Sequence, residues 1–388
     1  MTATPVAFDK KTTISPVRVV PPLPVLNTMI HRRPCPELSL VLVTHLLDTA
    51  VPFVRALASA MSVHAVVAVP YSLRDSAHEA LAGLVPVHTP STLSEIGPLV
   101  ARLSAEALER TGRSVVVQEV GGYCATTLDD VAGHHRFLGV VEDTHQGQWR
   151  YEERQPLRYP VYTIADSPLK DLENRQVGRS LAYSMDHLLR TRFFRHVGET
   201  SIAVLGYGGI GSALAATLRA LGSEVAVYDT DDIKTSRAMV DGHLTMPRDR
   251  ILGWADVVLG VSGTRSFTVD DLAYVRDGTI LASGSSKKVE FDVDGMRSRG
   301  VVEQEDDVMA ELIAADRRVF LLNDGRPVNF LAQSVLGNVL DLIYSELYLC
   351  TRNLGLEDRG PGIHRLDAGL QQEIARTWKQ IYGDRGWS

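Results

Sequence analysis

Three glycines with a fixed spacing form the most specific pattern in the sequence. Gly206, Gly208 and Gly211 stand in GYGGIG, directly after the apolar segment IAVL and directly before a segment with helical periodicity. In such a turn the first glycine permits the tight bend, the second lets a pyrophosphate approach the backbone, and the third lets helix and strand pack closely. The pattern predicts a dinucleotide with its phosphates at a helix N-terminus. The alternative is a glycine turn that holds no ligand.

Acidic residues after the next predicted strand indicate which dinucleotide is bound. Asp229 ends that strand, where a carboxylate would accept hydrogen bonds from the adenosine ribose hydroxyls. Asp231 and Asp232 follow closely, and their charges would repel a 2′-phosphate, which favours NAD over NADP. For Asp229 the alternative is an ordinary surface carboxylate. To the same cofactor site we assign the rest of the glycine turn and the ends of two later strands: Gly209, Ile210, Ser262, Gly263 and Ser283.

The elements that position these residues alternate between strands and helices, which is typical of an α/β fold. The first series of predicted strands lies at 38–43, 64–69, 114–120 and 137–143, and a second series begins at Ser201. Ser167 and Pro168 have the residue types of a helix N-cap and first helical position, and open a long helix to about Phe194. A second long helix, at 330–350, is predicted to return to the first series. The chain would therefore cross twice between two lobes.

The length of 388 residues exceeds what one ordinary hydrophobic core accommodates. We predict a two-lobed α/β protein with a Rossmann NAD-binding domain, a flavodoxin-like α/β substrate domain and long bridging helices. The predicted boundaries are a loose N-terminal arm at 1–36, the substrate domain at 37–180 plus 332–388, and the NAD-binding domain at 181–331.

Composition excludes several classes of function. With 45% hydrophobic and 22% charged residues, the chain has the composition of a soluble globular protein, for which we expect a cytoplasmic location. A net charge of -7 without a basic block argues against nucleic acid and anionic lipid as partners. Three scattered cysteines suggest neither a disulfide framework nor a metal site. No signal peptide or membrane span is predicted.

Six motifs occur in an order that resembles the S-adenosylhomocysteine hydrolase family. They are EVGG (119–122), VVEDTHQG (140–147), PVYTIADSPLKDLENRQVG (160–178), GYGGIG, GTILASGSSKKVEFD (278–292) and GRPVNF (325–330). The resemblance covers about 119–345, more than half of the chain. It implies an NAD-dependent enzyme that oxidises a hydroxyl of a small molecule, assembled as a homodimer or homotetramer.

The resemblance also assigns candidate site residues. Lys170 would be the cation beside the oxidised hydroxyl, His45 stands where the family has a catalytic histidine, and Asp143 replaces a glutamate. Thr144 would contact NAD, and Asn329 would lie near the nicotinamide. The assignment of Lys170 is chemically reasonable, because an ammonium group can hold the developing alkoxide while hydride leaves. A solvated lysine, a structural histidine and an aspartate cap are the alternatives.

Other positions depart from the family on the substrate side. Val120 stands where the family has an active-site aspartate, Asn174 where it has a second aspartate, and Ser286 where it has a histidine. We keep Asn174 among the catalytic candidates. The family's glycine-histidine-proline loop after GRPVNF and its lysine and tyrosine tail have no counterpart. Since valine can accept neither a hydrogen bond nor a proton, adenosine recognition and elimination are both in doubt.

Three functions are compatible with this pattern. The leading hypothesis is oxidation of another hydroxyl-bearing small molecule, a nucleoside or other polyol. A divergent hydrolase is the second, with Lys287, Lys288 or Tyr123 replacing the lost side chains. The third is a non-catalytic NAD-binding regulator. A 2-hydroxyacid dehydrogenase is less favoured, because the arginine expected near Ser285 for a substrate carboxylate is missing.

Overall fold

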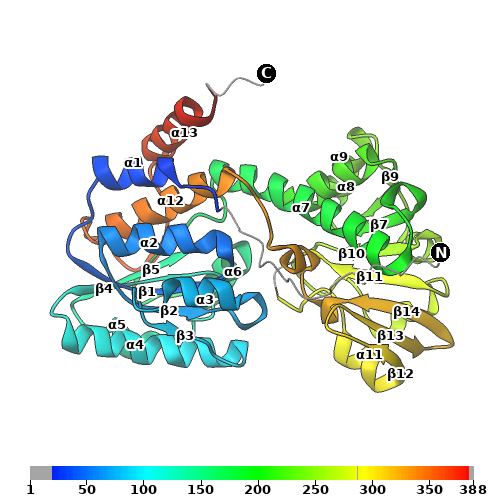
Figure 1. The fold of residues 1–388 in the computed structure, drawn as a ribbon, viewed down its shortest axis with the longest axis horizontal. Coiled ribbons are helices and arrows are strands. Elements are labelled where there is room, and N and C mark those ends of the chain that lie inside the picture. Colours follow the sequence, from blue (N-terminus) through cyan, green and yellow to red (C-terminus); the bar gives the residue numbers. More distant parts are fainter. Residues whose placement is uncertain (1–19, 286, 384–388) are drawn as a thin grey trace, which may run out of the picture.

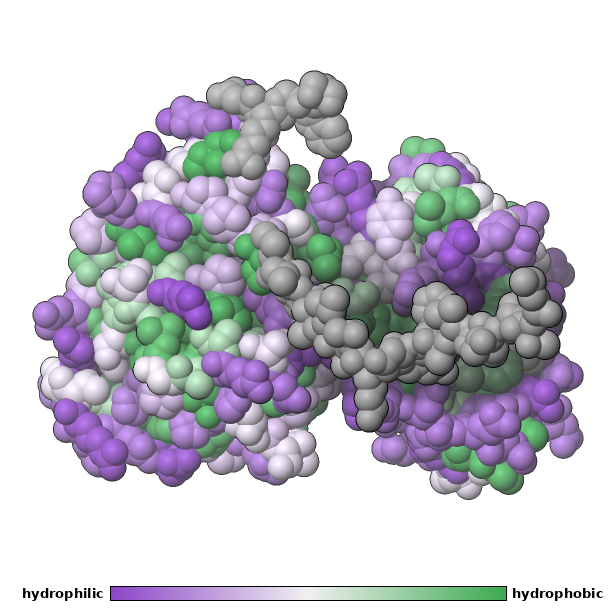
Figure 2. Space-filling view, in the orientation of Figure 1, coloured by the Kyte–Doolittle hydropathy of each residue, from purple (hydrophilic) through white to green (hydrophobic). Residues whose placement is uncertain are grey.

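A computed structural model describes residues 20–285 and 287–383 of the chain. The described chain forms two α/β lobes side by side, each built around its own sheet (Figure 1). The outline of the molecule narrows between the lobes, and the face shown in Figure 2 mixes polar and apolar side chains on both of them. The predicted two-lobed α/β fold is confirmed.

The first lobe contains a seven-stranded parallel sheet. Its strands are β1 (Leu38–Thr44), β2 (Ser62–Ala68), β3 (Val87–His88), β4 (Ser114–Glu119), β5 (Phe137–Glu142), β6 (Pro160–Thr163) and β15 (Gly362–His364). They are ordered β15-β6-β5-β4-β1-β2-β3. Without the two-residue edge strand β3 and the late strand β15, this is the flavodoxin-like order that we predicted.

Alternating side chains of the first sheet enter two separate cores, which explains the nearly continuous apolar sequence of β1. Leu40 and Leu42 pack on one face, and Val41 and Val43 on the other. The first face is covered by α1 (Pro24–Arg32), α2 (Val51–Ala60), α3 (Asp75–Leu81), α12 (Val339–Leu354) and α13 (Ala368–Gly383). The second face is covered by α4 (Ile96–Arg110), α5 (Asp129–Ala132) and α6 (His145–Glu153).

Helix α1 corrects the expectation of a loose N-terminal arm. Its side chains Val25, Leu26 and Met29 are buried against α12 and α13. The amides of Val25 and Leu26 also donate hydrogen bonds to the buried carboxylate of Asp341, at 2.8 and 2.9 Å. These bonds satisfy helix N-terminal amides that lack partners within the helix. The rest of the predicted arm, residues 1–19, lies outside the described residues.

The second lobe contains an eight-stranded sheet ordered β12-β13-β14-β11-β10-β7-β8-β9. Its strands are β7 (Ser201–Leu205), β8 (Glu224–Tyr228), β9 (Leu244–Thr245), β10 (Val257–Gly260), β11 (Thr279–Ser283), β12 (Gly300–Glu305), β13 (Met309–Ala314) and β14 (Arg317–Leu322). The part from β9 to β14 is parallel and has the Rossmann order 3-2-1-4-5-6. The antiparallel strands β12 and β13 extend it, and the sequence analysis did not predict them.

Helices connect the strands of the second lobe and join it to the first. They are α8 (Gly209–Ala220), α9 (Asp232–Val240), α10 (Arg248–Trp254), α11 (Val293–Arg299) and the bridging helix α7 (Pro168–Phe193). Figure 1 shows α7 running from the first lobe into the second. Among the described residues no helix is long and apolar enough to cross a membrane.

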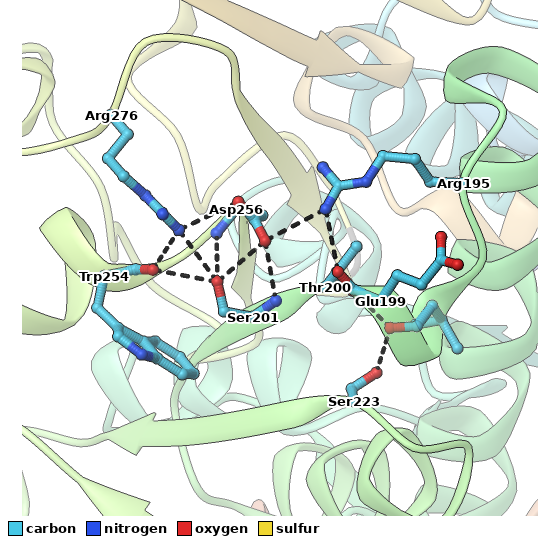
Figure 3. Close-up of polar contacts among 9 residues, drawn as sticks. Arg195, Glu199, Thr200, Ser201, Ser223, Trp254, Asp256 and Arg276 are labelled. Carbon is cyan, nitrogen blue, oxygen red and sulfur yellow. Dashed lines mark hydrogen bonds and ion pairs between the residues drawn. The ribbon is translucent and has the colours of Figure 1, made fainter.

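A polar cluster joins the amino ends of β7 and β10, at the edge of the second sheet opposite the glycine turn (Figure 3). The Asp256 carboxylate accepts hydrogen bonds from the amide and hydroxyl of Ser201, at 3.0 and 3.1 Å. Arg276 and Arg195 approach it at 3.1 and 3.4 Å. Burial raises the Asp256 pKa, but Ser201 and the two guanidinium groups outweigh it, so the net shift is downward. The cluster fixes this edge of the sheet.

Candidate active site between the lobes

The carboxyl ends of the parallel strands of both sheets face one cavity of about 480 Å³. In each sheet the strand order reverses between two central strands, β1 and β4 in the first and β7 and β10 in the second. Ligands of open α/β sheets bind at such reversal points. Residues that follow all four strands line the cavity, namely His45, Val120, Gly208 and Ser262. The cavity is therefore the candidate active site.

The glycine turn has the geometry that its spacing predicts. Gly206 has a φ of +112°, and a Cβ there would lie 2.8 Å from the Ser262 nitrogen. A Cβ on Gly211 would lie 2.1 Å from the Gly206 oxygen, so helix α8 packs closely on β7 only without a side chain. Gly208 has open space where a Cβ would stand. The open backbone at the start of α8 leaves room for a pyrophosphate.

Asp229 lies at the end of β8, as predicted, and it also holds the glycine turn. One carboxylate oxygen accepts a hydrogen bond from the Tyr207 amide at 2.6 Å, and the other accepts one from the Asp231 amide at 2.9 Å. Each carboxylate oxygen has a further lone pair for a ribose hydroxyl. Gly209 and Ile210 line the cavity, whereas Gly206, Gly211 and Asp229 shape or flank the turn.

A buried glutamate that sequence reasoning missed organises the loop after β10. The Glu290 carboxylate accepts hydrogen bonds from the Ser262 hydroxyl at 2.9 Å and from the Gly263 amide at 2.6 Å. It also accepts a short hydrogen bond from Ser285. Ser262, Gly263 and Ser285 line the cavity. Ser283 is fully buried and lies outside the set of described residues that line it.

Asn329 provides a test of whether the cavity fits NAD. It lines the cavity, is only 3% exposed, and its side-chain nitrogen donates to the Ser334 hydroxyl at 2.8 Å. Its side-chain oxygen has no hydrogen-bond partner among the described residues. A buried unpaired acceptor is unfavourable by roughly 1–3 kcal/mol. The carboxamide of a nicotinamide carries the N–H donor that this oxygen needs, so the residues present fit the cofactor.

Thr144 lines the cavity but uses its hydroxyl within the protein. The hydroxyl donates to Glu142 at 2.7 Å and accepts from the Gly147 amide at 3.0 Å, which makes Thr144 the N-cap of α6. Burial, followed by the nearby charge of Glu119, raises the pKa of Glu142 to about 8. The predicted contact of Thr144 with NAD stays a prediction, because only its remaining lone pair and methyl group are available.

Lys170 lies at the floor of the cavity between two carboxylates. Its Nζ atom is 2.7 Å from the Asp143 carboxylate and also pairs with Glu173, one turn further along α7. Burial lowers the Lys170 pKa, but the two carboxylates outweigh it and raise the pKa above its ordinary value. Burial raises the Glu173 pKa more than Lys170 lowers it. Lys170 is therefore a cation at neutral pH, with two of its three protons donated to carboxylates.

The first turn of α7 is fixed by buried hydrogen bonds, which positions Lys170. The N-cap residue Ser167 accepts from the Leu169 amide at 3.1 Å and donates to the Glu346 carboxylate of α12 at 2.7 Å. Gln371 of α13 donates to the same carboxylate at 2.8 Å. Burial raises the Glu346 pKa to about 7. Three helices thus meet behind the lysine and hold it in place.

His45 lies beside this cluster with a neutral ring. Its Nδ1 atom is 2.6 Å from the Ser72 hydroxyl, which donates to the Val69 carbonyl at 3.2 Å. This arrangement places the ring proton on Nδ1 and leaves Nε2 as an acceptor. The ring centroid lies 4.8 Å from that of Phe330 and 5.6 Å from that of Tyr71. Burial is the main cause that lowers the His45 pKa to about 4; the charge of Asp143 raises this pKa, and the charges of Lys170 and Lys287 lower it.

An apolar wall with one phenol faces the charged cluster. Phe53 and Tyr344 stack with ring centroids 4.0 Å apart and an interplanar angle of 5°. The Tyr344 hydroxyl makes no hydrogen bond to any described residue. Burial, and then the charges of Asp143 and Glu173, raises its pKa, so the phenol stays neutral. The other apolar side chains of this wall are Leu47, Val120, Leu336, Leu340, Ile343 and Leu347.

The remaining predicted residues fall in different places. Asn174 lines the cavity on the cofactor side, where a Cβ on Gly209 would lie 3.2 Å from its side chain. Ser286 lies outside the described residues. Sequence reasoning missed Glu173 and Tyr344, which the structure adds to the site. Glu173 could have been found from its position three residues after Lys170 on a predicted helix, because side chains at this spacing are neighbours.

Sequence comparison finds relatives for about two thirds of the chain. Residues 182–335 match the family model described as S-adenosyl-L-homocysteine hydrolase, NAD binding domain. The chain is 26% identical to an adenosylhomocysteinase of Pyrobaculum aerophilum, over 67% of this chain and 61% of that protein. It is 26% identical to an S-inosyl-L-homocysteine hydrolase of Methanopyrus kandleri, over 66% of this chain and 62% of that protein. It thus matches less than two thirds of the length of these relatives.

Solved structures with a similar arrangement share little sequence with the chain. One of them, a dipicolinate synthase from Bacillus halodurans, is 12% identical and aligns over 83% of this chain and 98% of that chain, with a TM-score of 0.47. A D-isomer specific 2-hydroxyacid dehydrogenase from Lactobacillus delbrueckii is 11% identical over 66% of this chain and 74% of that chain, with a TM-score of 0.34.

Proposed function

We propose that the chain oxidises a hydroxyl group of a small molecule other than S-adenosylhomocysteine. The chain is a divergent relative of the S-adenosylhomocysteine hydrolases, and residues 182–335 match the NAD-binding domain of that family. The observation that carries the proposal is the position of Lys170. A cationic lysine held by Asp143 and Glu173 lines the same cavity as the open glycine turn. A donor for a developing alkoxide and a place for NAD thus face one another.

In this proposal, each of several side chains of the site has a separate role in the oxidation of the alcohol. NAD, when bound, accepts a hydride from the carbinol carbon. The third proton of Lys170 is available to the substrate oxygen, which it stabilises as negative charge develops there. His45, neutral and with Nε2 free, accepts the hydrogen bond of the substrate hydroxyl and is the candidate proton acceptor. Asn329 orients the nicotinamide through its unpaired oxygen.

The substrate pocket supports a molecule other than S-adenosylhomocysteine. Val120 contributes an apolar surface where the family has an aspartate, and Tyr344 adds a phenol that makes no hydrogen bond within the described part of the chain. Two of the three side chains considered as replacements, Lys287 and Lys288, are engaged elsewhere. The Nζ atom of Lys287 donates to the Gly121 carbonyl at 2.8 Å, and Lys288 pairs with Asp324 at 2.8 Å. Neither lysine is among the described residues that line the cavity. This arrangement disfavours a divergent hydrolase.

The decisive experiment is nucleotide extraction and an absorbance spectrum of the purified protein, before and after addition of adenosine, S-adenosylhomocysteine and a panel of other polyols. We expect bound NAD that a polyol of the panel reduces, without rapid cleavage of S-adenosylhomocysteine. Cleavage at an ordinary enzymatic rate would overturn the altered substrate. NAD that binds but is never reduced would favour a regulatory role. Homo-oligomeric assembly and a cytoplasmic location stay predictions.

A further inference from the structure

Helix α6 of the first lobe reaches across the cavity to the second lobe. The Gln146 side chain donates a hydrogen bond to the Gly263 carbonyl at 3.3 Å. The indole of Trp149, one turn further along, lies 3.6 Å from where a Cβ on Gly263 would stand. Gly263 itself has a φ of +80°, which a side chain would make unfavourable. Two residues of one helix therefore contact one glycine of the opposite lobe.

Trp149 occupies the rim of the cavity rather than a core. Its side chain lines the cavity and is 40% exposed, and its ring neighbour is His145 at 6.3 Å. A tryptophan is among the side chains that gain most from burial and from stacking on another ring. The exposed part of this indole is therefore apolar surface that a flat ligand in the cavity could cover.

The loop that Trp149 touches lies beside the glycine turn. A Cβ on Gly206 would lie 2.8 Å from the backbone of Val261 and Ser262, so the turn and the loop 261–264 are in contact. Both line the cavity. A dinucleotide with its pyrophosphate at the turn must pass along this loop towards Asn329. Trp149 contacts this loop at Gly263 and also lines the cavity, so it borders that path.

We propose that Trp149 is a cofactor-positioning residue that packs against the bound dinucleotide and, with Gln146, closes the cavity over it. The proposal rests on the proposed NAD-dependent function. It implies that release of the dinucleotide requires α6 to separate from the loop at Gly263. Its chemical basis is the contact of an indole with the flat, cationic nicotinamide or its ribose, which needs no group beyond those present.

The test uses the full-length protein, with NADH as the fluorescent probe and NAD as the released ligand. We compare wild type with Trp149→Phe, Trp149→Ala and the matched control Trp254→Phe, which replaces a tryptophan of α10 that does not line the cavity. Energy transfer from tryptophan to bound NADH should decrease more in Trp149→Phe than in the control, because Trp149 lines the cavity whereas Trp254 does not. Dissociation of NAD should be about tenfold faster in Trp149→Ala, because one aromatic contact is lost.

The outcomes separate this proposal from the function on which it rests. Wild type that binds neither NAD nor NADH would overturn both. Binding in wild type, with equal energy transfer in Trp149→Phe and equal dissociation in Trp149→Ala, would overturn the role of Trp149 alone. Trp149→Phe also guards against misfolding, since it keeps an aromatic ring at the rim while removing the fluorophore. Loss of transfer in this variant, with NADH still bound, would support the contact.

Discussion

The molecule contains two charged clusters of opposite composition. One lies at the amino ends of strands in the second sheet, and the other lies at the cavity, next to the carboxyl ends of the strands. At the outer edge of the second sheet, the acid Asp256 stands between Arg195 and Arg276 (Figure 3). At the cavity, the base Lys170 stands between two carboxylates. The Lys170 side chain is 8% exposed, whereas that of Arg276 is 47% exposed. Solvent can screen the first cluster, whereas the second depends on its internal pairing.

This difference separates a stabilising cluster from a functional one. Each exposed ion pair contributes little to the free energy of unfolding, so Asp256 is stabilised mainly by its hydrogen bonds to Ser201. Burying three charged side chains carries a large desolvation penalty. Apolar side chains of similar volume in their place often give a protein that is equally or more stable. Such a cluster next to a cavity is therefore a sign of chemistry rather than of stability.

Removing the lysine of the buried cluster should have the largest effect. In Lys170→Met the carboxylates of Asp143 and Glu173 lose their cation, and we expect unfolding free energy at neutral pH to fall by roughly 3 kcal/mol. The deficit should shrink as pH falls, because Glu173, whose pKa is already raised by burial, then takes up a proton. Oxidation of the alcohol should fall at least about 100-fold. Urea unfolding at several pH values measures the first effect, and an undiminished stability at neutral pH would contradict the pairing.

A buried lysine that forms no ion pair with a carboxylate of the described residues should behave in the opposite way. Burial, and then the charge of Arg150, lowers the Lys287 pKa to about 8, so the folded state disfavours its charge at neutral pH. The penalty is complete below that value and fades as pH rises towards the unfolded pKa. Lys287→Gln keeps a donor for Gly121 without the charge. We expect it to be more stable than wild type by about 1–2 kcal/mol near pH 7, with the difference shrinking as pH rises from 8 towards 10.5.

Unfolding of this variant and of wild type, compared across that pH range, measures the difference directly. Lys288→Gln is the control, because Lys288 forms a partly exposed pair with Asp324. A constant difference between Lys287→Gln and wild type would show that the lysine charge is not the cause.

The exposed cluster should respond moderately and without loss of function. Asp256→Asn removes the carboxylate between two guanidinium groups, and we expect a loss of about 1 kcal/mol at neutral pH. Because the Asp256 pKa is lowered in the folded state, this contribution is present above the unfolded pKa and disappears as pH falls through the folded pKa. NAD binding, measured by titration, should match wild type. Impaired binding would mean that this edge of the sheet is coupled to the cavity.

The smallest change in stability is expected for the phenol of the apolar wall. Tyr344→Phe keeps the ring stacked on Phe53, so unfolding free energy should change by less than about 0.5 kcal/mol. Binding of the polyol that reduces NAD should weaken severalfold, because a hydrogen bond to substrate is lost. Tyr344→Leu, which also removes the stack, serves as the comparison. Equal affinity of wild type and Tyr344→Phe would place the phenol outside the substrate contact.

The cofactor half of the site could be predicted because its signals are local. The functions of Gly206, Gly208 and Gly211 follow from their spacing within one turn, and the structure gives each the predicted geometry. The substrate half depends on contacts between distant segments. Tyr344 of α12 meets Phe53 of α2, and the buried acid Glu290 ties two loops together. No periodicity in one segment predicts such a pairing.

The same dependence on contacts between distant segments explains why parts of the fold could not be predicted from the sequence. Residues 1–36 were expected to form a loose arm, but α1 lies within this range and is packed against the first lobe. This helix is held by Asp341, an acid more than 300 residues away whose burial was not evident from the sequence. The assignment of Asn174 to catalysis, made from the family pattern, stays a prediction; its side chain lies beside Gly209. The tertiary fold brings these residues together, whereas local sequence patterns indicate only the individual helices and strands.

The two crossings of the chain between the lobes also determine how the molecule can move. Helix α7 begins at Ser167, bound to α12, and ends in the core of the second lobe, where Leu188 and Leu189 are buried. The return crossing packs against α7 and includes Gln333, with a φ of 66°, and Gly337, with a φ of 65°. Because the two connections lie side by side, we expect any relative movement of the lobes to be a rotation about α7. Such a rotation would separate Trp149 from Gly263, which it contacts across the cavity.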